Sequence, residues 1–140
     1  MTTALDTNVI IALWDKDPAI SSPSRRALEI AFLGGGLVIA APVFAELLAA
    51  PGRTELFLNK FLQETTIVVD WNLGEEVWRT GARAFQSYAE RRRKQRDAGA
   101  RRILADFLIG AHALVHGFRF LTRDQGLYRA AFPQLRILTV

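Results

Sequence analysis

Short apolar runs alternate along the chain with longer stretches in which apolar and polar positions recur at helical spacing. The short runs predict strands over residues 3–5, 37–40, 66–69, 118–122 and 136–138. The longer stretches predict helices over residues 8–14, 24–33, 54–63, 74–92 and 103–116, and one more that opens at Pro42 and carries Glu46. Strands separated by helices are typical of a parallel sheet. We therefore expect an α/β fold, with one domain over residues 1–140.

Composition narrows the class of protein. The chain has 140 residues, of which 50% are hydrophobic and 23% are charged, and this suits a soluble globular domain with its own core. It contains no cysteine, which excludes a disulfide scaffold, a thiolate zinc site and a cysteine nucleophile. The uncharged stretch over residues 30–45 is shorter than a membrane span, and glycines and Pro42 interrupt it. The opening residues lack the basic region of a secretory signal, so we expect a cytoplasmic protein with no membrane partner.

Four of the 14 acidic residues differ from ordinary surface charge because of their surroundings. Asp6 directly follows the first predicted strand, and Asp124 follows the fourth. Glu46 and Asp106 lie within apolar helical sequence, where an ionised carboxylate is costly unless a cation compensates for it. Taken singly, each acid is more typical of a helix cap, a turn or an ion pair.

As a set, these acids indicate a metal site. The carboxyl ends of parallel strands share one edge of a sheet, where open α/β folds bind ligands, and Asp6 and Asp124 both fall at such ends. Asp106 lies near the start of its helix, where the helix dipole favours the ionised form. Oxygen ligands suit Mg²⁺ or Mn²⁺, and carboxylate clusters that hold such ions are typical of phosphodiester hydrolysis. Metal-assisted hydrolysis of a nucleic acid is therefore the leading hypothesis.

The segments around these acids resemble, in their order and spacing, the four motifs of PIN-domain ribonucleases, and in particular the VapC toxins of toxin–antitoxin pairs. The segments are Leu-Asp-Thr-Asn-Val-Ile at residues 5–10, the helical Glu46, Ala-Asp-Phe-Leu-Ile-Gly-Ala-His-Ala at 105–113 and Leu-Thr-Arg-Asp at 121–124. The resemblance covers nearly the whole chain. It implies an α/β/α sandwich around a parallel sheet and a Mg²⁺- or Mn²⁺-dependent endoribonuclease, usually a homodimer held inactive by a VapB antitoxin.

The resemblance also implies a role for each motif residue. Glu46 would complete the catalytic acidic cluster, directly or through a water. Asn8 and Thr122 match polar positions of the first and last motifs, and we expect them to orient the carboxylates or a water. Three aspartates would bind the metal: Asp6, Asp106 and Asp124.

Positive charge is concentrated in one segment, which we call the basic block. Seven of the 18 Arg and Lys residues lie within residues 91–102 and are opposed there only by Asp97, so the rest of the chain has a slight excess of acid. Such a block suits contact with RNA phosphates or with an acidic partner segment, although a solvated helix end is the commoner explanation. The block consists of Arg91, Arg92, Arg93, Lys94, Arg96, Arg101 and Arg102.

His112 and His116 are four residues apart on one predicted helix, a spacing that can hold zinc. No third ligand with suitable spacing is evident in the sequence. We therefore expect these histidines to belong to the core.

Two other classes of function stay open. A nucleic-acid-binding module on the same fold would bind RNA without cleaving it, although it would have no reason to keep buried carboxylates that repel phosphate. A phosphotransfer domain with Asp6 as its nucleophile would need a second acid two residues later and a lysine near the last strand. The chain has Asn8 at the first of these places and no lysine after Lys94.

Overall fold

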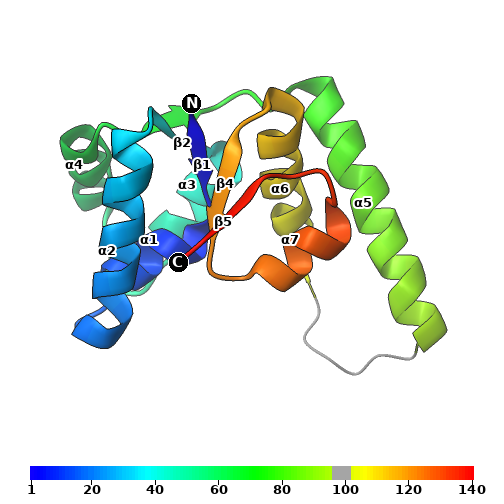
Figure 1. The fold of residues 1–140 in the computed structure, drawn as a ribbon, viewed down its shortest axis with the longest axis horizontal. Coiled ribbons are helices and arrows are strands. Elements are labelled where there is room, and N and C mark those ends of the chain that lie inside the picture. The colour runs from blue at the N-terminus through cyan, green and yellow to red at the C-terminus, as the bar shows by residue number, and fades with distance from the viewer. Residues whose placement is uncertain (96–101) are drawn as a thin grey trace.

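A computed structural model of the chain describes residues 1–95 and 102–140. In that part of the chain, five strands form one sheet in the order β3-β2-β1-β4-β5, and each neighbouring pair is parallel (Figure 1). The first strand is central because the chain crosses from β3 back to the other side of β1 before it forms β4. The strands are β1 (Thr3–Leu5), β2 (Leu37–Ala40), β3 (Val68–Asp70), β4 (Arg119–Thr122) and β5 (Ile137–Thr139).

Helices cover both faces of the sheet. In Figure 1, α2 and α4 lie to one side of the strands, and α5, α6 and α7 lie to the other. The long helix α5 packs along α6. The arrangement confirms the expected α/β/α sandwich with a central parallel sheet. The described helices are α1 (Thr7–Leu13), α2 (Pro18–Leu33), α3 (Ala41–Leu48), α4 (Glu55–Thr65), α5 (Gly74–Gln95), α6 (Leu104–His116) and α7 (Gln125–Ala131).

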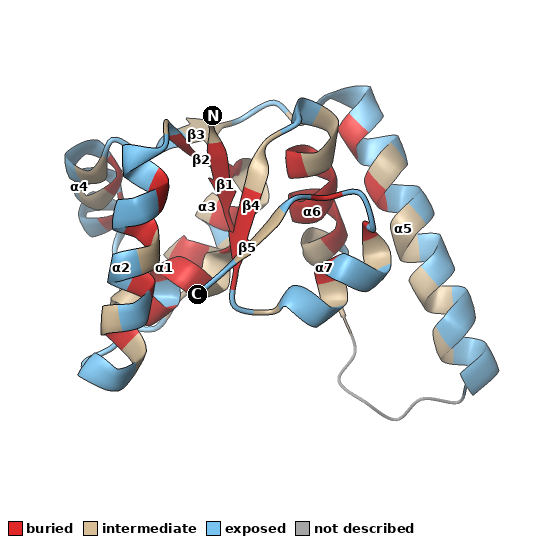
Figure 2. Ribbon diagram, viewed as in Figure 1, coloured by how far each residue is buried: buried red, intermediate tan, exposed pale blue. Residues whose placement is uncertain are grey.

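The core lies on both faces of the central strands and includes most of α6. Strands β1 and β2 are buried along their whole length (Figure 2), and they read as continuous apolar runs because both faces of the sheet are covered. In α6 every residue from Phe107 to Ala113 is buried. A helix that is buried all round is held from several sides. It is thus a fixed platform for the polar side chains it carries, Asp106 near its start and His112 and His116 near its end.

Several element boundaries differ from those the sequence predicts, and two of the shifts have a clear local cause. Helix α2 begins at Pro18, earlier than expected, because the Asp17 carboxylate caps its first turn. Strand β3 begins at Val68, because Thr66 takes a left-handed conformation (φ 57°) that ends α4. The β-branched run therefore starts with a helix cap and not with the strand.

Helix α7 lies in a stretch for which the sequence predicts no element. Its Tyr128 is buried, with its ring centroid 4.6 Å from that of Phe120 in β4. On the facing helix α6, a β-carbon at Gly110 would overlap the Phe132 ring and would stand 3.0 Å from Tyr128. The missing side chain of Gly110 is therefore what lets α7 and the residues after it close on α6.

The basic block is divided by the structure. Helix α5 extends to Gln95, so Arg91, Arg92, Arg93 and Lys94 belong to its last turns. Arg96 and Arg101 lie outside the described residues, and Arg102 directly precedes the start of α6. Within residues 1–95 and 102–140, no helix is long and apolar enough to cross a membrane.

Candidate active site

The site is built where the two central strands end. Asp6 follows β1, and its backbone N–H donates to the Leu121 carbonyl of β4 at 2.9 Å, so the pairing of the strands continues to the carboxylate. Its Oδ1 atom accepts the Thr7 backbone N–H at 2.8 Å, which caps α1, and its Oδ2 atom accepts the Thr122 hydroxyl at 2.7 Å. The aspartate is thus fixed by the end of one strand and the start of one helix.

Burial governs the protonation of Asp6. The residue is 5% exposed, and this burial raises the pKa of its carboxyl to about 6. The hydrogen bonds from Thr122 and Thr7 oppose the rise, whereas the negative charge of Asp106 adds to it. The carboxylate is ionised at neutral pH, but at an unusual energetic cost.

One hydroxyl connects three parts of the site. The Thr122 Oγ1 atom donates to Asp6 and accepts the Asp124 backbone N–H at 2.9 Å and the Asn8 side-chain amide at 3.5 Å. The Asn8 carbonyl oxygen in turn accepts the Arg123 backbone N–H at 3.1 Å. Thr122 therefore orients a carboxylate directly, while Asn8 fixes the turn that carries Asp124.

Glu46 reaches the site from α3. Its Oε1 atom accepts the Thr7 hydroxyl at 2.6 Å. Burial raises the pKa of Glu46, the Thr7 hydrogen bond lowers it, and the charge of Asp106 raises it further. Thr7 consequently links the N-terminal end of α1 to the carboxylate on α3, a role that the sequence did not indicate.

Asp106 lies in the first turn of α6 and is the electrostatic centre of the cluster. Its Oδ2 atom accepts the Ile103 backbone N–H at 3.4 Å. Burial raises the pKa of Asp106, the Ile103 N–H and the Arg102 charge lower it, and the charge of Asp124 raises it. Because Asp106 also raises the pKa of Asp6 and of Glu46, the structure brings all four predicted acids into one electrostatic cluster.

One member of the basic block reaches this cluster. The Arg102 Nη1 atom donates to Asp124 Oδ2 at 2.7 Å, and both side chains are about one third exposed. The pair lies at the solvent side of a cluster whose inner member, Asp6, is buried. Positive charge therefore borders the acids at the place where a polyanion could approach them.

Tyr128 completes the surroundings of Asp6 from α7. Its buried hydroxyl interacts with Asp6 and lowers the pKa of that carboxyl. Burial and the neighbouring negative charges raise the pKa of Tyr128 itself, so the phenol keeps its proton. Sequence analysis missed this residue because it missed α7.

The donor set fits a hard divalent cation. Four carboxylates from four segments converge, and burial and mutual repulsion disfavour the ionised forms of three of them. A divalent cation would offset both effects, since oxygen is the ligand that Mg²⁺ and Mn²⁺ prefer. The four carboxylates are not tightly grouped. Among the described residues, the three metal-ligating side chains whose ligand atoms all lie within 4.8 Å of one another are those of Asp70, His112 and His116.

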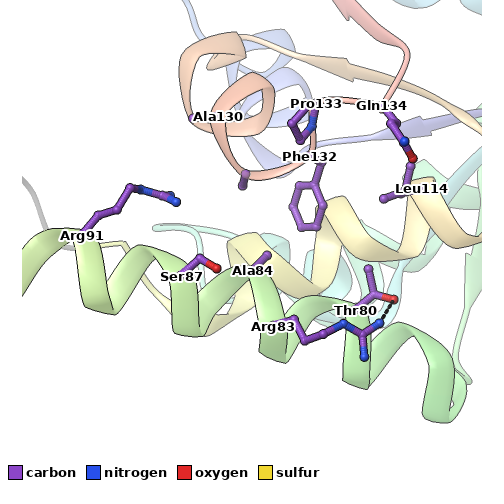
Figure 3. Close-up of a pocket in the computed structure, with 11 residues that line it drawn as sticks. Thr80, Arg83, Ala84, Ser87, Arg91, Leu114, Ala130, Phe132, Pro133 and Gln134 are labelled. Atoms are coloured by element: carbon purple, nitrogen blue, oxygen red, sulfur yellow. Dashed lines mark hydrogen bonds between the residues drawn. The ribbon is translucent and has the colours of Figure 1, made fainter.

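A pocket away from the acids is lined by another member of the basic block, Arg91. It lies between α5 and α7, and Figure 3 shows the Phe132 ring in it, opposite Ser87 and Ala84. Arg91 and Arg83 line the same pocket, and Arg83 donates to the Thr80 hydroxyl at 3.4 Å. None of the four acids lines it, so the structure does not bring Arg91 to the cluster as it brings Arg102.

Comparison with known proteins agrees with this fold. A family model for the PIN domain matches residues 3–133. Among solved structures, VapBC2 from Rickettsia felis bound to a DNA fragment from their promoter matches with a TM-score of 0.72 and 19% identity, over 99% of this chain and 98% of that chain. A toxin–antitoxin complex from Klebsiella pneumoniae matches with a TM-score of 0.68 and 18% identity, over 98% and 96%. FitAcB from Neisseria gonorrhoeae matches with a TM-score of 0.65 and 25% identity, over 97% and 96%. No curated protein matches the chain.

Proposed function

Because the chain belongs to the PIN domain family, whose members are generally nucleases, we propose that it is a metal-dependent endoribonuclease of the VapC type. The observation that carries the proposal is the convergence of four carboxylates at the carboxyl ends of β1 and β4, with raised pKa values for Asp6, Glu46 and Asp106. Perturbed acids gathered in one place are typical of catalytic sites. Phosphodiester hydrolysis is the reaction class that such a cluster serves.

In this proposal Asp6, Asp106 and Asp124 hold Mg²⁺ or Mn²⁺, and Glu46 completes the cluster directly or through a water. The bound ion would acidify a water molecule and neutralise the negative charge that builds up on the phosphate. Such hydrolysis leaves a 5′-phosphate and a 3′-hydroxyl.

The remaining side chains position this machinery. Thr122 donates a hydrogen bond to Asp6, the Tyr128 hydroxyl interacts with the same carboxylate, and Thr7 donates a hydrogen bond to Glu46. These contacts would keep the acids oriented when RNA approaches. Arg102 is placed to exchange its partner Asp124 for a phosphate of the RNA backbone. The exchange would draw the substrate towards the acids and release Asp124 for the ion.

We further propose a VapB-type antitoxin as the protein partner and a homodimer as the active assembly in the cytoplasm. The support is the similarity in fold to VapBC2 from Rickettsia felis and to the toxin–antitoxin complex from Klebsiella pneumoniae. The partner would have to cover or disorder the acid cluster to hold the enzyme inactive.

The nuclease is tested with purified, partner-free protein and a pool of structured RNAs that includes tRNA. We expect cleavage at discrete positions in Mg²⁺ or Mn²⁺, none in EDTA, and none with Asp6→Ala or Asp106→Ala. The control is Glu75→Ala, which removes an exposed acid paired with Arg79 on α5 and should leave cleavage unchanged.

Two outcomes would contradict the proposal. Cleavage that persists in both aspartate variants under full chelation would place the activity elsewhere. Salt-sensitive RNA binding without turnover in either metal would favour the non-catalytic binding module on the same fold.

A further inference from the structure

A second group of metal-ligating side chains lies at the other end of α6. His112 and His116 are the two histidines of the chain, and they face Asp70, the last residue of the edge strand β3. At 1.5 Å per residue, they are about 9 and 15 Å along the helix axis from Asp106. This group is therefore separate from the acid cluster.

The third member of the group, Asp70, could not be found from the spacing of residues in the sequence. Asp70 lies 42 residues before His112, and only the path of the chain through β3 and α5 brings it to the end of α6. Sequence analysis placed the histidines in the core for lack of a third ligand. That expectation holds for His112, which is buried, but His116 is 39% exposed.

The distances suit a tetrahedral ion. The His112 Nε2 atom lies 3.0 Å from Asp70 Oδ2, the His116 Nε2 atom lies 3.9 Å from it, and all three ligand atoms lie within 4.8 Å of one another. Zinc bonds of about 2.1 Å in a tetrahedron separate two ligand atoms by about 3.4 Å. Small side-chain movements would thus bring the three atoms onto one ion.

The surroundings hold one side of the group and leave the other open. His112 is fully buried, and its Nδ1 atom has no hydrogen-bond partner in the part of the chain that the structure describes, so its polar contact is with Asp70. The Phe118 ring packs against both imidazoles, at 5.7 and 5.3 Å between centroids. The Asp70 side chain is 31% exposed, so an ion could enter from solvent with a water as fourth ligand.

The chemistry of the ligands differs from that of the acid cluster. Two imidazoles and one carboxylate suit Zn²⁺ and its neighbours Co²⁺ and Ni²⁺ better than Mg²⁺. Burial lowers the pKa of His112 and so favours the neutral imidazole, which is the form that binds a metal.

We propose that Asp70, His112 and His116 form a zinc-class metal site that joins the edge strand β3 to the C-terminal end of α6. The bound ion would cross-link two segments far apart in sequence and stabilise the native chain against unfolding. This site does not rest on the proposed nuclease function.

The test measures metal binding by the chelator-stripped protein. Zn²⁺ is titrated in competition with a chromophoric chelator, and Co²⁺ is followed by its visible absorption, which reports nitrogen ligands and tetrahedral geometry. We expect one equivalent of Zn²⁺ and a higher melting temperature. His116→Gln and Asp70→Asn should each weaken binding at least about tenfold, since even the outer partners of a metal ligand contribute that much.

The Asp106→Asn variant is the matched control, because it alters the acid cluster and leaves the histidines intact. It should bind Zn²⁺ like the parent protein, whether or not either protein cleaves RNA. Circular dichroism checks that His116→Gln, a change at a partly exposed position, keeps the fold. The proposal is overturned if Zn²⁺ does not bind, or if it binds His116→Gln and Asp70→Asn as tightly as the parent protein; the histidines would then only pair with Asp70.

Discussion

The Asp6 carboxyl accepts hydrogen bonds from Thr7 and Thr122 and interacts with Tyr128, yet its pKa is raised to about 6 because burial outweighs these contacts. In the unfolded chain the same group has a pKa of about 3.8. Between these values the native state binds more protons than the unfolded state, so this group's contribution to stability is lost as the pH rises from about 4 to above 6. The shift corresponds to about 3 kcal/mol.

Replacing Asp6 with asparagine should therefore separate stability from activity. Asparagine can still cap α1 but carries no charge to bury, so in EDTA at pH 7.5 the free energy of unfolding should rise by roughly 1–3 kcal/mol. At pH 4 the difference from the parent protein should nearly vanish. Urea unfolding at the two pH values measures both, and RNA cleavage by the variant should be absent.

The control for this experiment is Glu75→Gln, at an exposed acid of α5, which should leave unfolding unchanged at either pH. A variant at Asp6 that is less stable than the parent protein at pH 7.5 would show that the charge of Asp6 is compensated in the folded chain without a metal.

At this scale, sequence reasoning singled out Asp6 because it directly follows a short apolar strand, and Thr122 because it matches a polar position of the last motif of the resembled family. Sequence reasoning could not have identified Thr7 and Tyr128. Whether the Thr7 hydroxyl turns towards Glu46 depends on how α1 and α3 pack, and Tyr128 reaches Asp6 only because α7 folds back on α6.

Among the elements, the contact between α6 and α7 decides whether the site is complete. Gly110 allows this contact, since any larger residue would meet Phe132 and Tyr128. The position of α7 in turn sets the Tyr128 hydroxyl against Asp6. Packing at the middle of one helix is therefore coupled to the orientation of a carboxylate at the end of a strand.

We predict that Gly110→Ala destabilises the protein by about 1–3 kcal/mol, the usual cost of overpacking, although alanine favours helix formation. Cleavage should fall with it, because Tyr128 is displaced. The matched control is Gly126→Ala in α7, where a β-carbon meets nothing within 4 Å. That change should be neutral or stabilising by up to about 1 kcal/mol. Equal stability of the two variants would contradict the packing argument.

The elements that sequence reasoning found are those with a strong apolar pattern. The buried strands β1 and β2 and the apolar α6 match their predicted ranges to within a residue. The short helix α7 was not predicted because seven residues give little hydrophobic periodicity and Gly126 lowers the helix propensity of the segment. Tertiary contact through Tyr128 stabilises it where local sequence does not.

Over the whole molecule, opposite charges meet at Arg102. The basic segment ends there, and the acid cluster begins with its partner Asp124. RNA bound at the acids would have to pass this guanidinium.

We predict that Arg102→Gln weakens RNA binding and lowers the slope of log K against log salt concentration by about one, as expected for one lost phosphate contact. Filter binding with the Asp106→Ala background, which prevents cleavage, measures the slope. Arg79→Gln on α5 removes a guanidinium that is paired with Glu75 and should change neither quantity. An unchanged slope for Arg102→Gln would rule out the phosphate contact.

The pairing of β1 with β4 has a consequence for the synthesis of the protein. Residues 3–5 pair with residues 119–121. The strands made in between, β2 and β3, lie on the opposite edge of β1. A nascent chain whose Thr122 and Asp124 are still inside the ribosome lacks the hydroxyl donor of Asp6 and one of the four acids of the cluster. If the chain is the proposed nuclease, such an incomplete site would not cut RNA. The topology would then delay nuclease activity until translation has passed the fourth strand, so the ribosome that makes the protein would not be exposed to that activity while most of the chain is still being made.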